Sequence, residues 1–318
     1  MTGVWQLTGG DAHPTTSARL KLWVKFFWIA TLIRVWRKYL TNVLTLPVYY
    51  GISRIAAYGD ISVAGNEKAI CEFLFSNMGR INLKHIGILR QIGIPDKNYT
   101  DYRLAESLSD IATLSTTDSR KKADVYLNGK GVSIKQAGSS FSFNRLQRAN
   151  LIQVYSRLGL TAPQTILTQL DQEIHRFHQG LLSSRDRPWH DFFSENDFKT
   201  ILKFLMMLGS PNLGMSQHLA ELILEAPATQ ISQDTIKIYS FDEYFNRYKE
   251  KLHIAIRRQW IGQKSKSEHG RAISLAKKPD NLPWLFDDVV GIPRGGWRND
   301  IDEADRKTVY FLMIEKKK

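Results

Sequence analysis

An aspartate, a serine and a lysine lie close together around a tight turn, in the segment KKADVYLNGKGVSIKQ at residues 121–136. Alternating apolar residues predict a strand on each side of the turn, and Asn-Gly is a strong hairpin signal. Successive side chains of a strand point to opposite faces. If the apolar faces join, Asp124, Ser133 and Lys135 lie on the same side of the hairpin.

This combination of side chains is suited to the hydrolysis of a phosphodiester. Carboxylates bind Mg²⁺ together with water, and the metal neutralises the phosphate and lowers the pKa of a bound water. An ammonium beside the attacking water stabilises the negative charge that develops on the phosphate. The alternative is an ordinary hairpin whose polar residues form its wet face, because short motifs also arise by chance.

Ala123-Asp124 and Ser133-Ile134-Lys135 resemble the motif of the PD-(D/E)xK nuclease superfamily, and within it type II restriction endonucleases. A helix–hairpin–helix setting extends the resemblance to roughly residues 60–160. The resemblance implies that Asp124 binds metal and that Lys135 stabilises charge and positions the water. Ala123 replaces the proline of the motif, and Ser133 replaces its second acid. Ser133 would therefore act as a secondary or water-mediated ligand. The set of metal ligands would then have one negative charge fewer than in the motif.

Glu67 could supply that missing charge. The spacing of Cys71, Leu74 and Met78 predicts a helix whose inward side includes Glu67. Related nucleases often place a glutamate from such a helix beside the metal. An acid in the first turn of a helix also serves as a cap, and both interpretations stay open.

The charge balance favours a polyanionic partner. Lys and Arg total 44 against 31 Asp and Glu, a formal net charge of +13, which indicates nucleic acid first and an anionic membrane second. Basic residues are dense between residues 247 and 278. We expect double-stranded DNA to be contacted by the helix after the hairpin and by this basic region; solvated surface arginines and lysines are the alternative. The candidate DNA-binding residues are Arg145, Arg148, Arg257, Arg258, Lys264, Lys266, Arg294 and Arg298.

The pattern of elements predicts a mixed α/β fold, with a central mixed sheet flanked by helices as in a restriction-endonuclease-like core. We expect a basic and aromatic N-terminal extension or helix at 1–57, a nuclease-like catalytic core at 58–226 and a basic α+β DNA-recognition region at 227–318. Expected helices include residues 101–120, 142–160 and 217–227. A strand followed by a basic helix is expected at 237–260, a charged segment with a short strand at 262–281 and a closing strand at 307–317.

The single cysteine, Cys71, excludes an internal disulfide and is expected in the core, which suits a reducing cytoplasm. Basic residues interrupt the aromatic segment near the N-terminus, which argues against a membrane-spanning helix there. A helix packed on the body, an interfacial membrane helix and a poorly ordered extension remain open for it. We expect no stable membrane association.

These features together predict a cytoplasmic enzyme that hydrolyses DNA with Mg²⁺ and an activated water, without a covalent intermediate. The resemblance implies a short duplex recognition sequence, a homodimer and a cognate DNA methyltransferase. Two other classes stay open. One is a repair, recombination or defence nuclease of the same fold without a fixed site. The other is a nucleic-acid-binding protein whose catalytic site has decayed at Ser133.

Overall fold

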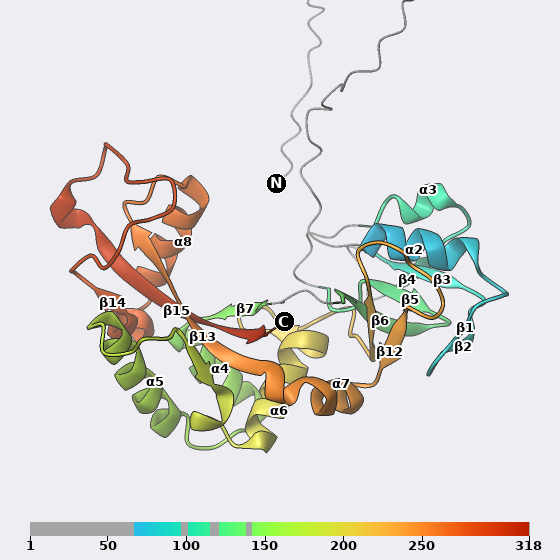
Figure 1. Ribbon diagram of the computed structural model, residues 1–318, viewed down its shortest axis with the longest axis horizontal. Helices are drawn as coiled ribbons and strands as arrows, with labels where there is room; N and C mark the ends of the chain where they lie inside the picture. The colour runs from blue at the N-terminus through green and yellow to red at the C-terminus, as the bar shows by residue number, and fades with distance from the viewer. Residues whose placement is uncertain (1–66, 97–100, 115–120, 138–141, 318) are drawn as a thin grey trace, which may run out of the picture. The chain divides into compact units, whose positions relative to one another are not determined.

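The structure is a computed structural model that describes residues 67–96, 101–114, 121–137 and 142–317 (Figure 1). All of them belong to one compact unit, residues 61–318. The predicted extension at 1–57 lies outside the described residues. The chain is mixed α/β with a central mixed sheet flanked by helices, which confirms the predicted fold class.

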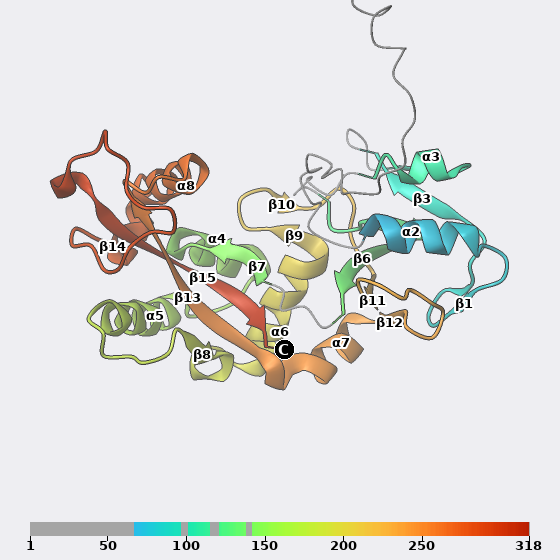
Figure 2. The ribbon, with the colours of Figure 1, turned by 45° about the horizontal axis from the view of Figure 1, so that its top comes forward.

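The central sheet has six strands in the order β12–β11–β6–β5–β3–β4. Strands β6 and β11 are parallel, and the other neighbours are antiparallel. Helix α2 (Glu67–Ser76) covers one face, where Cys71 and Leu74 share a buried core with Val125 and Val132 (Figure 2). The strands are β3 (Ile92–Pro95), β4 (Tyr102–Leu104), β5 (Val125–Leu127), β6 (Lys130–Gln136), β11 (Leu222–Ala226) and β12 (Lys237–Tyr239).

A second sheet is built on the long antiparallel pair β13 (Leu252–Ile261) and β15 (Lys307–Lys316). Strand β8 (Asp186–Pro188) pairs with β13, whereas β14 (Leu285–Phe286) and β7 (Ser142–Leu146) pair with β15. Its buried residues join a large core with those of three helices, α4 (Arg148–Leu158), α5 (Pro163–His178) and α6 (Glu195–Lys203).

The remaining described helices and strands lie outside the two sheets and the helices named above. They are α3 (Leu108–Ile111), α7 (Phe241–Tyr248), α8 (Lys266–Ala276), β1 (Asn82–Leu83), β2 (Gly87–Ile88), β9 (Gly209–Ser210) and β10 (Gly214–Met215). Short 3-10 helices lie at Trp189–Asp191, Lys249–Lys251, Pro279–Trp284 and Glu303–Asp305, and a π-helical turn lies at Phe204–Leu208. Within the ranges that the structure describes, no helix is long and apolar enough to cross a membrane.

The predicted hairpin is confirmed as β5 and β6, and its turn explains why these residues form it. Asn128 and Gly129 both have positive φ, 48° and 83°, the left-handed backbone that a tight hairpin turn requires. The Asn128 side-chain oxygen also accepts the backbone N–H of Arg90 at 2.8 Å, which fixes the turn against the neighbouring segment. The turn therefore sets the register in which Val125 lies opposite Val132.

Several predicted helices are wrong. Residues 217–227 contain strand β11, which is buried along its whole length, and such a strand shows an unbroken apolar run rather than a helical or alternating period. Within 101–120, the described residues form β4 and the short α3 instead of one long helix. The segment 142–160 begins as strand β7 before α4 starts.

The C-terminal third mixes confirmed and wrong predictions. The strand β12 with its following helix α7 and the closing strand β15 are confirmed. The basic helix predicted to extend to residue 260 ends as α7 at Tyr248, and Leu252–Ile261 form strand β13, whose β-branched residues pair with β15. The charged segment after it is helix α8 rather than a strand. The two sheets also draw strands from both sides of residue 226, so the predicted division of the chain does not coincide with the division into sheets.

Candidate functional site

Asp124, Ser133 and Lys135 form one cluster at the hairpin. The Asp124 Oδ2 atom accepts the backbone N–H of Ile134 at 2.7 Å and the Ser133 hydroxyl at 3.3 Å. The Lys135 ammonium donates to Ser133 Oγ at 2.8 Å and to the Ile134 carbonyl at 3.0 Å. Ser133 therefore bridges the acid and the amine, from a side chain that is only 2% exposed.

Close backbone packing holds the hairpin against the chain that leads into β11. A Cβ atom on Gly131 would lie 2.2 Å from the Leu219 carbonyl oxygen, so a larger residue would push the two segments apart. The Gly131 carbonyl accepts the N–H of Glu221 at 2.7 Å. Beyond this contact, β6 and β11 run parallel, with Lys135 opposite Glu225. The site therefore sits on a central strand that has neighbours on both sides.

Glu67 belongs to the same site, although it comes from the start of α2. Partial burial and the nearby Asp124 raise the pKa of Glu67 to about 7, while Lys135 acts in the opposite direction. The Glu67 carboxylate is thus in electrostatic range of both hairpin residues. Two carboxylates that repel each other in a poorly solvated place are stabilised by a cation between them. Carboxylate and hydroxyl oxygens are the types of ligand that a divalent metal such as Mg²⁺ accepts.

Lys122 is a site residue that the sequence reasoning missed. Burial lowers the pKa of Lys122 to about 8, with Lys135 acting in the same direction and Asp124 against it. Its ammonium donates to the Leu205 carbonyl oxygen at 2.8 Å. Lys122 precedes the first residue of β5, so neither strand alternation nor the Asp124…Lys135 motif places it at the site.

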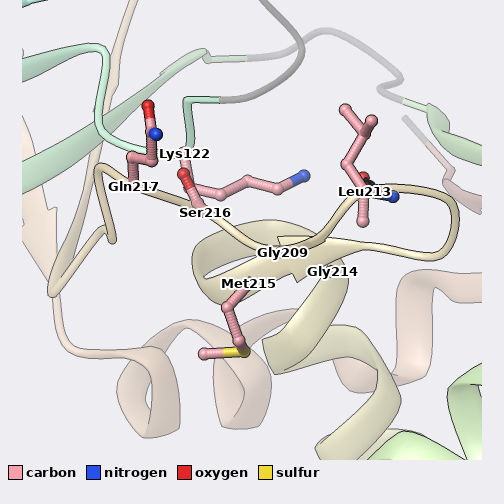
Figure 3. A pocket seen from close by; sticks show the side chains of 8 residues that line it. Lys122, Gly209, Leu213, Gly214, Met215, Ser216 and Gln217 are labelled. Atoms are coloured by element: carbon pink, nitrogen blue, oxygen red, sulfur yellow. Dashed lines mark hydrogen bonds between the residues drawn. The ribbon is translucent and has the colours of Figure 1, made fainter. Parts of the chain in front are cut away.

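Lys122 also lines a pocket of about 180 Å³ beside the β9–β10 hairpin. Figure 3 shows its side chain lying along that hairpin. Leu213 and Met215 in the pocket wall are 57% and 56% exposed. A Cβ on Gly209 would lie 2.1 Å from the Gly214 carbonyl oxygen, so this narrow hairpin depends on glycine. The pocket thus combines one amine of the site with an apolar wall.

The candidate DNA-binding residues divide into structural and exposed ones. Arg148 makes a bidentate ion pair with the Asp171 carboxylate, in which Nε and Nη2 each lie 2.9 Å from one of its oxygens. Arg257 pairs with Glu315. Arg258 lies over the rings of Phe177 and Trp260.

Five candidates remain, and the structure describes the side chains of four of them. Lys264, Lys266 and Arg294 are exposed. Arg298 pairs with the exposed Asp300. Arg145 lies in β7, and its side chain is outside the described part of the structure. Among these candidates, the exposed residues without an ion pair to a described residue therefore all lie after β13.

A second cluster of metal-binding side chains lies in the other sheet. Asp186, His253 and Glu315 each offer one ligand atom, all within 4.8 Å of one another, so this group could hold a metal ion. The three residues come from β8, β13 and β15. No local spacing connects them in the sequence, and strand pairing alone brings them together.

Comparison of the chain with protein-family models, curated proteins and solved structures found no match.

Glu67→Gln is expected to stabilise the metal-free protein at pH 8. The pKa of Glu67 is raised from 4.5 to about 7, so folding takes up a proton there and stability falls as the pH rises through that window. Removing the charge should add on the order of 1–2 kcal/mol at pH 8, after allowance for partial solvent screening, and much less at pH 5. The measurement is thermal unfolding in a chelator at both pH values.

The matched control is Glu72→Gln, on the same helix, where the acid pairs with Lys68 at 3.8 Å on an exposed surface. It should change stability little at either pH. An equal shift at pH 5 and pH 8 in the Glu67→Gln protein would show that its charge is not disfavoured by burial and Asp124.

Proposed function

We propose that this protein is a Mg²⁺-dependent endodeoxyribonuclease that resembles type II restriction endonucleases. The observation that carries the proposal is the cluster itself. Two acids from separate elements, Asp124 and Glu67, share a partly buried site with the amine of Lys135. In the order of the chain, the hairpin that bears Asp124 and Lys135 follows α2 and precedes α4, a setting that extends the resemblance beyond the motif itself.

Each residue has a role in this proposal. Asp124 and Glu67 would bind Mg²⁺, which when bound neutralises phosphate charge and lowers the pKa of a water. Lys135 stabilises negative charge on the phosphate and positions the attacking water. Ser133 aligns Lys135 with Asp124 and offers a neutral, water-mediated ligand. Glu67 takes the place of the second acid that is missing at Ser133.

Duplex DNA is the proposed substrate because of charge. The net charge of +13 favours a polyanion, and the exposed Lys264, Lys266 and Arg294 are available for phosphates. Affinity should then fall steeply with salt. A short recognition sequence, a homodimer and a cognate DNA methyltransferase in the cytoplasm are further parts of the proposal that depend on the resemblance.

The test is incubation of the full chain with supercoiled plasmid and phage DNA, with Mg²⁺ or with a chelator. Discrete fragments that require Mg²⁺ support a restriction endonuclease. A smear or nicking supports a repair, recombination or defence nuclease without a fixed site. Binding without cleavage contradicts the enzymatic proposal and supports a nucleic-acid-binding protein with a decayed site.

Lys122→Met is expected to slow cleavage and to stabilise the fold. Loss of an amine close to the reacting phosphate should lower the rate by about 10–100-fold. Because the pKa of Lys122 is lowered to about 8, its charge opposes folding at pH 7, and methionine removes that penalty. Single-turnover cleavage and thermal unfolding measure the two effects. The exposed Lys203→Met is the control, and equal cleavage rates in both variants would exclude the role of Lys122.

A further inference from the structure

The second sheet brings one histidine and two carboxylates together without help from any loop. Strand β13 pairs with β15 on one side and with β8 on the other, and His253 lies opposite Glu315 in that pairing. His253 Nε2 is 3.4 Å from Asp186 Oδ1 and 3.8 Å from Glu315 Oε2. Ligand atoms on a tetrahedral metal at about 2.1 Å are about 3.4 Å apart. The two distances from His253 are therefore close to those that such a metal requires, and all three ligand atoms lie within 4.8 Å of one another.

Two polar atoms of this cluster have no hydrogen bond. His253 is 6% exposed, and its buried Nδ1 has no hydrogen-bond partner among the described residues. The buried Asp186 Oδ1, which faces His253, also has none within that part of the chain. Each such atom costs about 1–3 kcal/mol when water is removed and nothing replaces it. A ligand between Asp186 Oδ1 and His253 Nε2 would replace the lost solvation of the carboxylate, whereas the Nδ1 atom on the other side of the imidazole ring would not contact it.

The arginines around the cluster leave room for that ligand. Arg257 holds the Oε1 atom of Glu315, with its Nε at 2.8 Å, so Oε2 is directed to His253. Arg185 Nε approaches Asp186 Oδ1 only to 3.5 Å, from a side chain that is half exposed. Carboxylates that bind metals are commonly oriented by a second hydrogen bond of this kind.

We propose that Asp186, His253 and Glu315 form a Zn²⁺ site. Imidazole and carboxylate together suit zinc, whereas Mg²⁺ prefers oxygen ligands alone. Asp186 and His253 also line a pocket of about 230 Å³ with His190 and Lys249 in its wall. This pocket gives the metal access from solvent and leaves its fourth position to a water. Because β8 meets β13 through only three residue pairs, the metal would fasten β8 to the sheet.

The test uses the full chain, stripped with a chelator, dialysed and then equilibrated with Zn²⁺ in the absence of DNA. Metal analysis after dialysis should find one zinc per chain. Asp186→Asn should raise the dissociation constant at least about 100-fold, while Asp191→Asn, an exposed acid nearby, should leave it unchanged. Circular dichroism checks that both variants are folded.

Co²⁺ gives a second measurement that needs no variant. Bound to the unaltered protein in place of zinc, it should show the visible absorption of a four-coordinate ion, displaced by one equivalent of Zn²⁺. Two outcomes would overturn the proposal: no zinc retained by the unaltered chain, or equal zinc retention in the Asp186→Asn protein. Neither depends on DNA cleavage, so this proposal and the proposed nuclease function can fail separately.

Discussion

Asp124→Asn is expected to lower the rate of Mg²⁺-dependent DNA cleavage by at least about 10³-fold. The asparagine side chain keeps an oxygen that can accept the N–H of Ile134, which Asp124 Oδ2 accepts at 2.7 Å. The fold of the hairpin should therefore persist. The lost property is the negative charge that the proposal assigns to metal binding. Initial rates measured across a Mg²⁺ titration, with DNA affinity measured separately in Ca²⁺, would separate catalysis from binding.

The matched control is Asp234→Asn, an exposed acid in the turn before β12, and its cleavage rate should equal that of the unaltered chain. Lys135→Ala should also abolish cleavage, because it removes the amine that lies 2.8 Å from Ser133 Oγ. If either Asp124→Asn or Lys135→Ala cuts DNA within about tenfold of the unaltered rate, these residues are not the catalytic ones.

The hairpin could be predicted from the sequence because its causes are local. Asn128 and Gly129 specify the turn, and the alternation of Val125 and Leu127 specifies the faces of the first strand. Once the register is fixed, Asp124 must fall near Ser133. The approach of Glu67 could be suggested from its helical spacing and from the resemblance to nucleases, but its electrostatic interaction with Asp124 depends on how α2 packs on the sheet.

Other features could not be predicted because their causes are distant in the sequence. Strand β11 is buried on both faces, so its apolar run resembles a buried helix until its partner strands are known. Arg148 and Arg257 are in a basic chain that favours a DNA-binding interpretation, yet each has a carboxylate partner within the fold, Asp171 and Glu315. Charge counts report net sign and cannot identify which arginines are already paired.

The ion pair between Lys316 and Glu225 shows the same dependence on distant residues. Glu225 lies in β11, opposite Lys135 of the candidate site, and Lys316 lies in β15 of the second sheet. Their charged atoms are 2.9 Å apart, and each residue is 4% exposed. The Tyr248 hydroxyl donates to the same carboxylate, and the Lys316 ammonium lies 4.1 Å from the Tyr248 ring. This buried pair therefore joins the second sheet to β11, the strand that pairs with β6 of the candidate site.

Lys316→Met is expected to destabilise the protein by about 3–5 kcal/mol at pH 7, because it leaves the Glu225 charge buried without its cation. Urea unfolding measures the loss. The double variant Glu225→Gln/Lys316→Met should recover most of it, since glutamine is neutral and can still accept the Tyr248 hydroxyl. The half-exposed Lys307→Met, which breaks a surface pair with the exposed Asp287, should cost less than about 1 kcal/mol. A double variant no more stable than Lys316→Met would show that lost packing, and not an unpaired charge, is the cause.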